Sequence, residues 1–329
     1  MRRHSESDTS WRKCDPVLVD HGRTKIAAIV GPTAAGKTAA ALEVAEALRA
    51  EIVSVDSMQM YSGMDIGTDK ATPEMRKRVP HHLLDAKDPS EDLSVQEFQE
   101  RARRAIKAVA TRGRLPLLVG GSGLYFRAVV DDLRFPPRRD DVRRALEQEA
   151  SEVGPEALYE RLRSLDPPAA ARMEPTNVRR IVRALEVIEI TGRRFSAGHD
   201  LGSYESIYEL AVAGVTRPRA ELFTRIDRRV DAMLQAGLME EARGVAERGM
   251  GRTARQALGY RQVLDAGPEA TAADVKPAVV AATKRFARRQ EAWFRADPRV
   301  QWFDASRPGL IQALRGFFVQ ELSLGTVSS

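Results

Sequence analysis

Eight residues near the start of the chain are suited to binding phosphate. Residues 31–38 read GPTAAGKT and match the pattern G-x-x-x-x-G-K-[ST] through Gly31, Gly36, Lys37 and Thr38. The backbone N–H groups of such a loop surround an anion, and the following helix adds the positive end of its dipole. Lys37 is expected to bridge two phosphates, and the Thr38 hydroxyl is expected to hold Mg²⁺. The pattern therefore predicts binding of a diphosphate or triphosphate.

A carboxylate, Asp56, ends the expected strand at 51–55 and begins a polar turn. At this place it faces the phosphate loop across a cleft. It can accept a proton from an incoming nucleophile, ligate Mg²⁺ or cap the turn. The residue taken alone leaves these three roles open.

A second glycine loop lies in LPLLVGGSGLYFRA, residues 115–128. Gly120 and Gly121 permit a close approach of the backbone, and Ser122 offers a hydroxyl at the start of a helix. The segment fits a binding loop and a tight strand-to-helix turn equally well.

The elements that must position these residues alternate between strand and helix. The expected strands are Ile26–Val30, Glu51–Val55 and Leu115–Val119, and the expected helices are Lys37–Arg49, Val95–Arg112 and Leu124–Val130. This alternation predicts an α/β fold, a parallel sheet with helices on both faces. Ligands of such sheets bind at the carboxyl ends of the strands, so the two glycine loops and Asp56 should converge.

The pattern changes after Leu133, where FPPRRD precedes an almost purely helical stretch from Asp141 to Thr191. We interpret this stretch as an inserted all-helical subdomain, in which Thr176-Asn177 caps a helix. A returning strand is expected at Ile207–Val215, then helices at Arg219–Ala236, Leu238–Gly249 and Thr271–Phe294, a short strand near Val300–Phe303 and a final helix. The predicted organisation is a flexible tail over residues 1–24, a core over 25–133 and 200–322, the insert over 134–199 and a tail over 323–329.

Composition excludes several classes of protein. No apolar run approaches the length of a membrane span, and the first 25 residues lack the apolar core of a signal peptide, so a cytoplasmic protein is expected. The one cysteine, Cys14, permits no internal disulfide and no thiolate metal cluster. The five histidines have no spacing typical of metal ligands.

Lysine and arginine outnumber aspartate and glutamate by 52 to 46, a net charge of +6. The basic residues crowd into 138–144, 179–194 and 284–295. Such clusters suit a polyanionic partner such as nucleic acid, although solvated helix faces have the same composition.

Seven segments, taken in order, resemble the motifs of bacterial tRNA dimethylallyltransferases, also called tRNA isopentenyltransferases. They are GPTAAGKT (31–38), DSMQMYSGMDIGTDK (56–70), HHLLD (81–85), VGGSGLYFRA (119–128), RRIVRALE (179–186), LGYRQ (258–262) and RRQEAWFR (288–295). The resemblance extends from about Lys25 to about Phe303. It implies a core like that of P-loop NTPases. A monomer is the default expectation for the enzyme.

The resemblance also implies a reaction, the transfer of a dimethylallyl group from dimethylallyl diphosphate to the exocyclic amine of adenosine 37 in a tRNA anticodon loop. Asp56 matches the general base, and Thr33 and Arg225 match the catalytic centre, with Arg225 expected to clamp the diphosphate. Mg²⁺ is the implied cofactor, with Thr38 as its ligand. The diphosphate is assigned to the whole phosphate loop, Gly31, Pro32, Thr33, Ala34, Ala35, Gly36, Lys37 and Thr38.

The same resemblance assigns contacts with tRNA to residues spread along the chain. The helical insert is expected to grip the anticodon stem, and the target base to be flipped into a pocket. The assigned residues are Asp56, Ser57, Met58, Gln59, Ser122, Arg143, Arg179, Arg180, Ile181, Val182, Arg183, Arg255, Gly259, Tyr260, Arg261, Arg288, Arg289, Gln290, Trp293 and Arg295.

Three other readings share some of these features. A P-loop kinase of small molecules would use the same loop, Mg²⁺ and aspartate. An adenylate isopentenyltransferase would perform the same chemistry without an extended basic surface. An RNA-binding protein with an inactive phosphate loop would not need Lys37, Thr38 and Asp56.

Overall fold

The centre of the molecule is a six-stranded sheet in which every neighbouring pair is parallel. The computed structural model describes residues 23–136, 138–197 and 203–324, so the expected tails lie almost wholly outside the described residues. Along the sheet the order is β3-β2-β4-β1-β5-β6. The strands are β1 (Lys25–Val30), β2 (Ala50–Ser54), β3 (His81–His82), β4 (Leu115–Gly120), β5 (Glu209–Thr216) and β6 (Val300–Asp304). The predicted fold class is confirmed.

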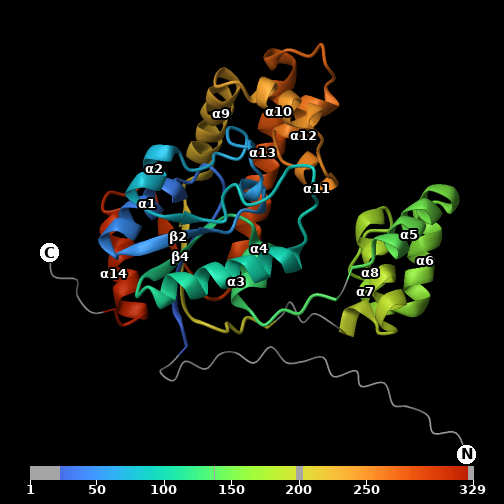
Figure 1. Cartoon of the computed structure of the whole chain (residues 1–329), viewed down its shortest axis with the longest axis horizontal. Helices are drawn as coiled ribbons and strands as arrows, with labels where there is room; N and C mark the ends of the chain where they lie inside the picture. The colour runs from blue at the N-terminus through green and yellow to red at the C-terminus, as the bar shows by residue number, and fades with distance from the viewer. Residues whose placement is uncertain (1–22, 137, 198–202, 325–329) are drawn as a thin grey trace, which may run out of the picture.

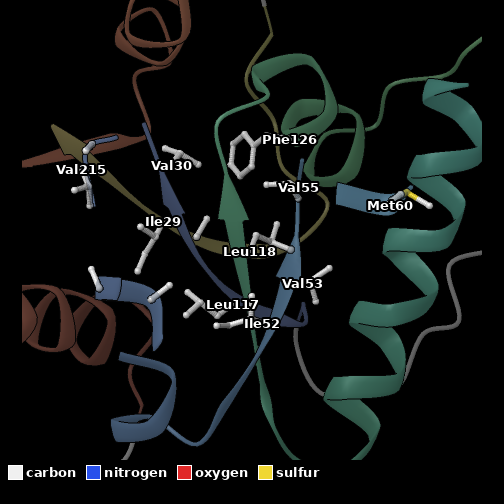
Figure 2. Close-up of a cluster of buried hydrophobic side chains, with 14 of the residues drawn as sticks. Ile29, Val30, Ile52, Val53, Val55, Met60, Leu117, Leu118, Phe126 and Val215 are labelled. Carbon is white, nitrogen blue, oxygen red and sulfur yellow. The ribbon is translucent and has the colours of Figure 1, made fainter. Parts of the chain in front are cut away.

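Helices cover both faces of the sheet, because its central strands are buried along nearly their whole length. α1 (Lys37–Ala47) and α3 (Val95–Thr111) lie on opposite sides of it (Figure 1). Successive side chains of a strand point to opposite faces, so Ile52 and Val53 of β2 enter different layers of the core (Figure 2). This packing fixes the carboxyl ends of β1, β2 and β4 beside one another.

The core also contains helices between and after these strands. α2 and β3, together with the short α11 and α12, were not expected from the sequence. The bounds are α2 (Pro73–Arg78), α4 (Gly123–Val130), α9 (Arg219–Gln235), α10 (Leu238–Glu247), α11 (Arg252–Arg255), α12 (Tyr260–Asp265), α13 (Ala272–Arg295) and α14 (Leu310–Glu321), with 3-10 turns η1 (Ser57–Met60) and η2 (Phe195–Ala197). No helix in the described part of the chain is both long enough and apolar enough to cross a membrane.

The stretch expected as a helical insert forms four helices that stand apart from the sheet (Figure 1). They are α5 (Asp140–Val153), α6 (Pro155–Leu165), α7 (Pro167–Ala170) and α8 (Val178–Thr191). These helices bury an apolar cluster of their own, which is separate from the core of the sheet. The predicted cap of α8 is confirmed, because the Asn177 side chain accepts the N–H of Arg180 at 3.3 Å. The expected end of the insert at residue 199 lies outside the described residues.

Candidate active site

The phosphate loop joins the carboxyl end of β1 to the N-terminus of α1, as its sequence requires. Gly31 has φ 136°, and a Cβ atom there would lie 2.3 Å from the carbonyl oxygen of Val215. Gly36 caps α1 in the left-handed conformation with φ 103°. Both positions therefore need glycine. The loop directs the positive end of α1 at the space above the sheet, where an anion is favoured.

A pocket opens at this edge of the sheet, and residues from before and after the helical insert line it. The phosphate loop supplies Thr33, Lys37 and Thr38, β2 and its following turn supply Asp56, and the second glycine loop supplies Gly120 and Gly121. The predicted convergence of the three segments is confirmed. The other lining residues are Ala41, Ile52, Ser54, Gln59, Thr68, Asp69, Ala71, His81, Val119, Arg229, Phe286 and Gln290.

Asp56 combines two of the roles that its sequence left open. Its Oδ1 accepts the N–H of Met58 at 3.0 Å and so caps the 3-10 turn η1, while the carboxyl group also lines the pocket. Burial raises the pKa of Asp56, and the Met58 N–H and the charges of Lys37 and Arg229 oppose that rise. A carboxylate with a raised pKa accepts a proton more readily than an exposed one, which favours the role of a base.

Lys37 lines the same pocket. Its Nζ donates to the carbonyl oxygen of Pro32 at 2.7 Å, within its own loop. Burial and then the nearby charge of Arg229 lower the pKa of Lys37 to about 8, against the opposite influence of Asp56 and Asp69. A phosphate ligand would restore a fully charged Lys37, because it places negative charge beside the ammonium.

Comparison with known proteins decides between the families that use such a pocket. Residues 59–297 match the family model of the IPP transferases. The chain belongs to the tRNA dimethylallyltransferase family. It is 52% identical to the tRNA dimethylallyltransferase of Streptomyces coelicolor over 281 residues, which cover 84% of this chain and 89% of the relative. It is also 52% identical to that of Thermobifida fusca over 295 residues, 87% of this chain and 92% of the relative.

Solved structures agree with this assignment. The tRNA isopentenylpyrophosphate transferase of Bacillus halodurans superposes with a TM-score of 0.67 at 41% identity, covering 92% of this chain and 97% of the other. The corresponding enzyme of Staphylococcus epidermidis gives a TM-score of 0.66 at 31% identity, covering 92% and 100%. The family resemblance read from the motifs is confirmed.

In this dimethylallyltransferase-family chain, two arginines on α9 lie close to the phosphate loop. Arg225, expected as a clamp for the diphosphate, is exposed and its Nε donates to the carbonyl oxygen of Ala34 at 2.8 Å. Arg229, one helical turn later, lines the pocket and pairs with Asp69 at 2.8 Å. Sequence reasoning missed Arg229 and Asp69, although the spacing of four residues between the arginines places both on one face of a helix.

Gln59, expected to contact tRNA, instead fixes the wall of the pocket. Its Oε1 accepts the hydroxyl of Ser54 at 2.8 Å, and its Nε2 donates to the carbonyl oxygen of Thr68 at 3.1 Å. The two neighbouring residues with the same expected role are also turned inward: Ser57 is 3% exposed, and Met58 packs against the hydrophobic core. The prediction that Ser57 offers its side chain to tRNA is wrong in this structure, because the turn η1 buries it.

The position of Tyr260 differs from the one expected from the sequence. It was expected on the tRNA surface, but its side chain is fully buried and its hydroxyl donates to Glu241. Glu241 in turn accepts the N–H groups of Asp65, Ile66 and Gly67, at 2.9, 2.9 and 3.2 Å. Tyr260 therefore supports the loop that carries Thr68 and Asp69 into the pocket. Gly259, also expected at the surface, is a buried cap of α12 with φ 91°.

The arginine-rich run of α8 separates into exposed and internal members. Arg179 and Arg180 are exposed, whereas Ile181 and Val182 are fully buried in the core of the insert, so the predicted tRNA contacts of these two side chains are wrong. Arg183 pairs at 2.9 Å with the buried carboxylate of Glu186. Arg143 lies 3.7 Å from the same carboxylate and pairs with Glu147 at 3.0 Å. The latter two arginines hold the insert together.

α13 also presents two different faces. Arg288, Arg289 and Arg295 are exposed, and Trp293 is 40% exposed although its ring covers Gly123, where a Cβ atom would lie 2.0 Å from Cδ1. Gln290, expected to contact tRNA, is 6% exposed and lines the pocket rather than the outer surface of the helix. The other expected contacts, Arg255 and Arg261, are exposed, and Ser122 is the N-cap of α4 without a capping bond from its hydroxyl.

The described residues offer few ligands for a metal ion. Within residues 23–136, 138–197 and 203–324, no three histidine, cysteine, aspartate or glutamate side chains gather as a metal site. The pocket does place the Thr38 hydroxyl and the carboxyl groups of Asp56 and Asp69 around one space. This sparse set of oxygen atoms fits Mg²⁺, which takes most of its ligands from water and substrate phosphates.

Proposed function

We propose that this chain transfers a dimethylallyl group from dimethylallyl diphosphate to the exocyclic amine of adenosine 37 in the anticodon loop of tRNA. The observation that carries the proposal is the placement of Lys37 and Asp56 in one pocket beside the N-terminus of α1. A diphosphate and a base are the two requirements of this reaction. The names of the relatives from Streptomyces coelicolor and Thermobifida fusca support the proposed substrates.

The phosphate loop holds the leaving group in the proposed reaction. Breaking the allylic C–O bond leaves its electron pair on the diphosphate, where negative charge grows. Lys37, Arg229 and the backbone N–H groups at the start of α1 meet that charge with fixed positive groups. Because these donors are held before the reaction, they stabilise the transition state more than the bound substrate.

Asp56 receives the proton in the proposed reaction. The N6 atom of adenosine forms a bond to the allylic carbon as the C–O bond breaks, and N6 then carries one proton too many. The half-buried carboxylate of Asp56, with its raised pKa, accepts that proton. Thr33, beside Lys37 in the lining of the pocket, is proposed to hydrogen-bond an oxygen of the leaving diphosphate.

Mg²⁺ is the proposed cofactor, held by the Thr38 hydroxyl together with the phosphates, and when bound it would neutralise part of the diphosphate charge. The acceptor base must leave the stack of its loop to enter the pocket. The exposed arginines of α8, α11, α12 and α13 are proposed to hold the RNA backbone outside the pocket. We further propose that the enzyme is a cytoplasmic monomer, a state that light scattering of the purified protein measures.

The test is transfer by the purified protein with Mg²⁺, dimethylallyl diphosphate and an unmodified anticodon stem-loop RNA, read by mass spectrometry of the nucleosides. A dimethylallyl mass increment on adenosine 37 is expected, and none on a matched RNA with guanosine at position 37. Product on free AMP in place of RNA would indicate an adenylate isopentenyltransferase. Consumption of ATP with a small acceptor, and no transfer to RNA, would indicate a kinase.

A further inference from the structure

Gln290 joins the two glycine loops that close the pocket. It lies on α13 and is 6% exposed. Its Oε1 accepts the backbone N–H of Thr33 at 2.8 Å, and its Nε2 donates to the backbone carbonyl oxygen of Gly121 at 3.0 Å. One side chain thus connects the phosphate loop, the second glycine loop and the last long helix of the core.

Only a carboxamide of this length satisfies both partners. The N–H of Thr33 needs an acceptor and the carbonyl of Gly121 needs a donor, and a glutamine side chain presents one of each in a single plane. Gly121 leaves the necessary room, because a Cβ atom there would lie 2.1 Å from Nε2 of Gln290 and 3.0 Å from the carbonyl oxygen of Gly31. Position 121 therefore has to lack a side chain because of Gln290 as well as because of the turn.

The bond from Thr33 also determines where the phosphate loop points. Because its N–H is bonded to Gln290, Thr33 does not offer this group to an anion in the pocket that the residue lines. The N–H groups left for an anion are those that follow in the loop. A shift of Gln290 would move Thr33 relative to Gly121 and to the pocket between them.

We propose that Gln290 is a positioning residue for the transfer reaction and does not contact tRNA. It sets the distance between the two glycine loops and holds Thr33 towards the bond that breaks. The inference rests on the proposed function and extends it. Neighbouring positions on α13 are more open to solvent, since Arg288 and Arg289 are exposed and do not line the pocket.

The first variant for the test is Gln290→Met, which keeps the length of the side chain and removes both hydrogen bonds. We expect kcat for transfer to fall about 100-fold, because a misplacement of about 1 Å at reacting groups has an effect of that size. The Kd for inorganic pyrophosphate should rise about tenfold, while the Kd for the anticodon stem-loop RNA should stay within about twofold. Gln312→Met is the matched control, since Gln312 is exposed on α14, and all three quantities should match the wild type.

A second variant tests the partner of the same bond. Gly121→Ala introduces the Cβ atom that meets Nε2 of Gln290, so it should reproduce the loss of kcat. If the two positions act through one connection, the double variant Gly121→Ala/Gln290→Met loses no more than the worse single variant. If the two substitutions caused independent defects, their effects on kcat would multiply in the double variant.

Each contrary result has a distinct meaning. A rise in the RNA Kd that accounts for the fall in kcat/KM would overturn the inference and return Gln290 to the RNA surface. Unchanged kcat and pyrophosphate binding in a folded Gln290→Met protein would also overturn it. If the wild type transfers nothing, the proposed function is wrong, but the Kd for inorganic pyrophosphate still tests the positioning role of Gln290. If Gln290→Met does not fold, Gln290→Glu, which keeps only the acceptor, is measured in its place.

Discussion

The pocket of the core and the helical insert hold their charged groups in different ways. In the pocket, Lys37 and Asp56 are held by backbone groups of their own segments, and burial shifts the pKa of each towards its neutral form. In the insert, Arg179 and Arg180 lie exposed on α8, above an apolar cluster that belongs to the insert alone. Charged side chains are therefore shifted towards their neutral forms in the pocket and are exposed to solvent on the insert.

This difference indicates how the two regions are used. A buried charge responds strongly to a ligand, because little water competes with it, and so it suits chemistry on a small diphosphate. An exposed arginine gains its binding energy from the release of counterions, and so it suits a long phosphate backbone at any sequence. Removing charges from the pocket should therefore lower the transfer rate, whereas removing charges from the insert should weaken RNA binding.

The largest expected effect is in the pocket. Asp56→Asn removes the proposed base but keeps the shape of the side chain, so kcat should fall by about 10²–10⁴ while RNA affinity stays within severalfold. Single-turnover transfer and RNA titration measure the two quantities. Asp132→Asn is the control, because Asp132 is exposed and lies 3.8 Å from Arg134 in a surface pair. Near-normal turnover of Asp56→Asn would remove Asp56 from the role of base.

The next effect is on the stability of the insert. Arg183→Met leaves the buried Glu186 carboxylate with the more distant Arg143, and breaking such a buried pair destabilises by about 3 kcal/mol. Hydrogen exchange should show faster opening of α5 and α8, with the β-sheet unchanged. The double variant Arg183→Met/Glu186→Gln should recover part of the loss. Uniform protection in the single variant would contradict this account of the insert.

A smaller effect is expected on RNA binding by the exposed arginines. Arg179→Gln with Arg180→Gln should weaken RNA binding roughly tenfold at moderate salt and reduce the slope of log K against log salt by about 1.4–1.8. Transfer to saturating RNA should be almost unchanged. Arg161→Gln with Arg163→Gln removes two charges from α6, also exposed, and should leave the slope as in the wild type. Equal slopes for both pairs would show that α8 does not contact the RNA backbone.

The smallest effect concerns pH. The pKa of Lys37 is lowered to about 8, so its charge is present below that pH and is lost as the pH rises through it. Binding of inorganic pyrophosphate should therefore weaken about tenfold between pH 7 and pH 9. The Lys37→Gln variant reports only the titration of pyrophosphate itself, and its pH dependence is subtracted from that of the wild type. If wild type and variant change in parallel over this range, Lys37 is not the titrating group.

The fold could be predicted from the sequence wherever a local pattern was strong. The apolar runs of β1, β2 and β4 and the phosphate-loop motif identified the parallel sheet and the edge at which the pocket lies. Short elements escaped prediction: β3 contains two residues, and α11 and α12 contain four and six. Such short elements are stabilised mainly by packing against neighbouring segments, so the local sequence alone does not predict them.

The site was predictable only to the level of which segments converge. Motif matching could not separate Arg179, which is exposed, from Ile181, which is buried two positions later, because both lie in one matched run. It likewise placed Tyr260 and Gln290 at the RNA surface, although their polar atoms bond inside the core. The direction of a side chain depends on distant partners such as Glu241 and Gly121, which no spacing in the sequence reveals.

The contact between Gly67 and Tyr260 has a consequence for how the family can diverge. A Cβ atom at position 67 would lie 2.3 Å from the ring of Tyr260, so a side chain at one position is compatible only with a smaller one at the other. The two positions are separated by most of the core sequence, yet they must mutate in concert or stay fixed. Paired changes at these two positions among relatives are therefore the expected sign of the packing that carries Asp69 into the pocket.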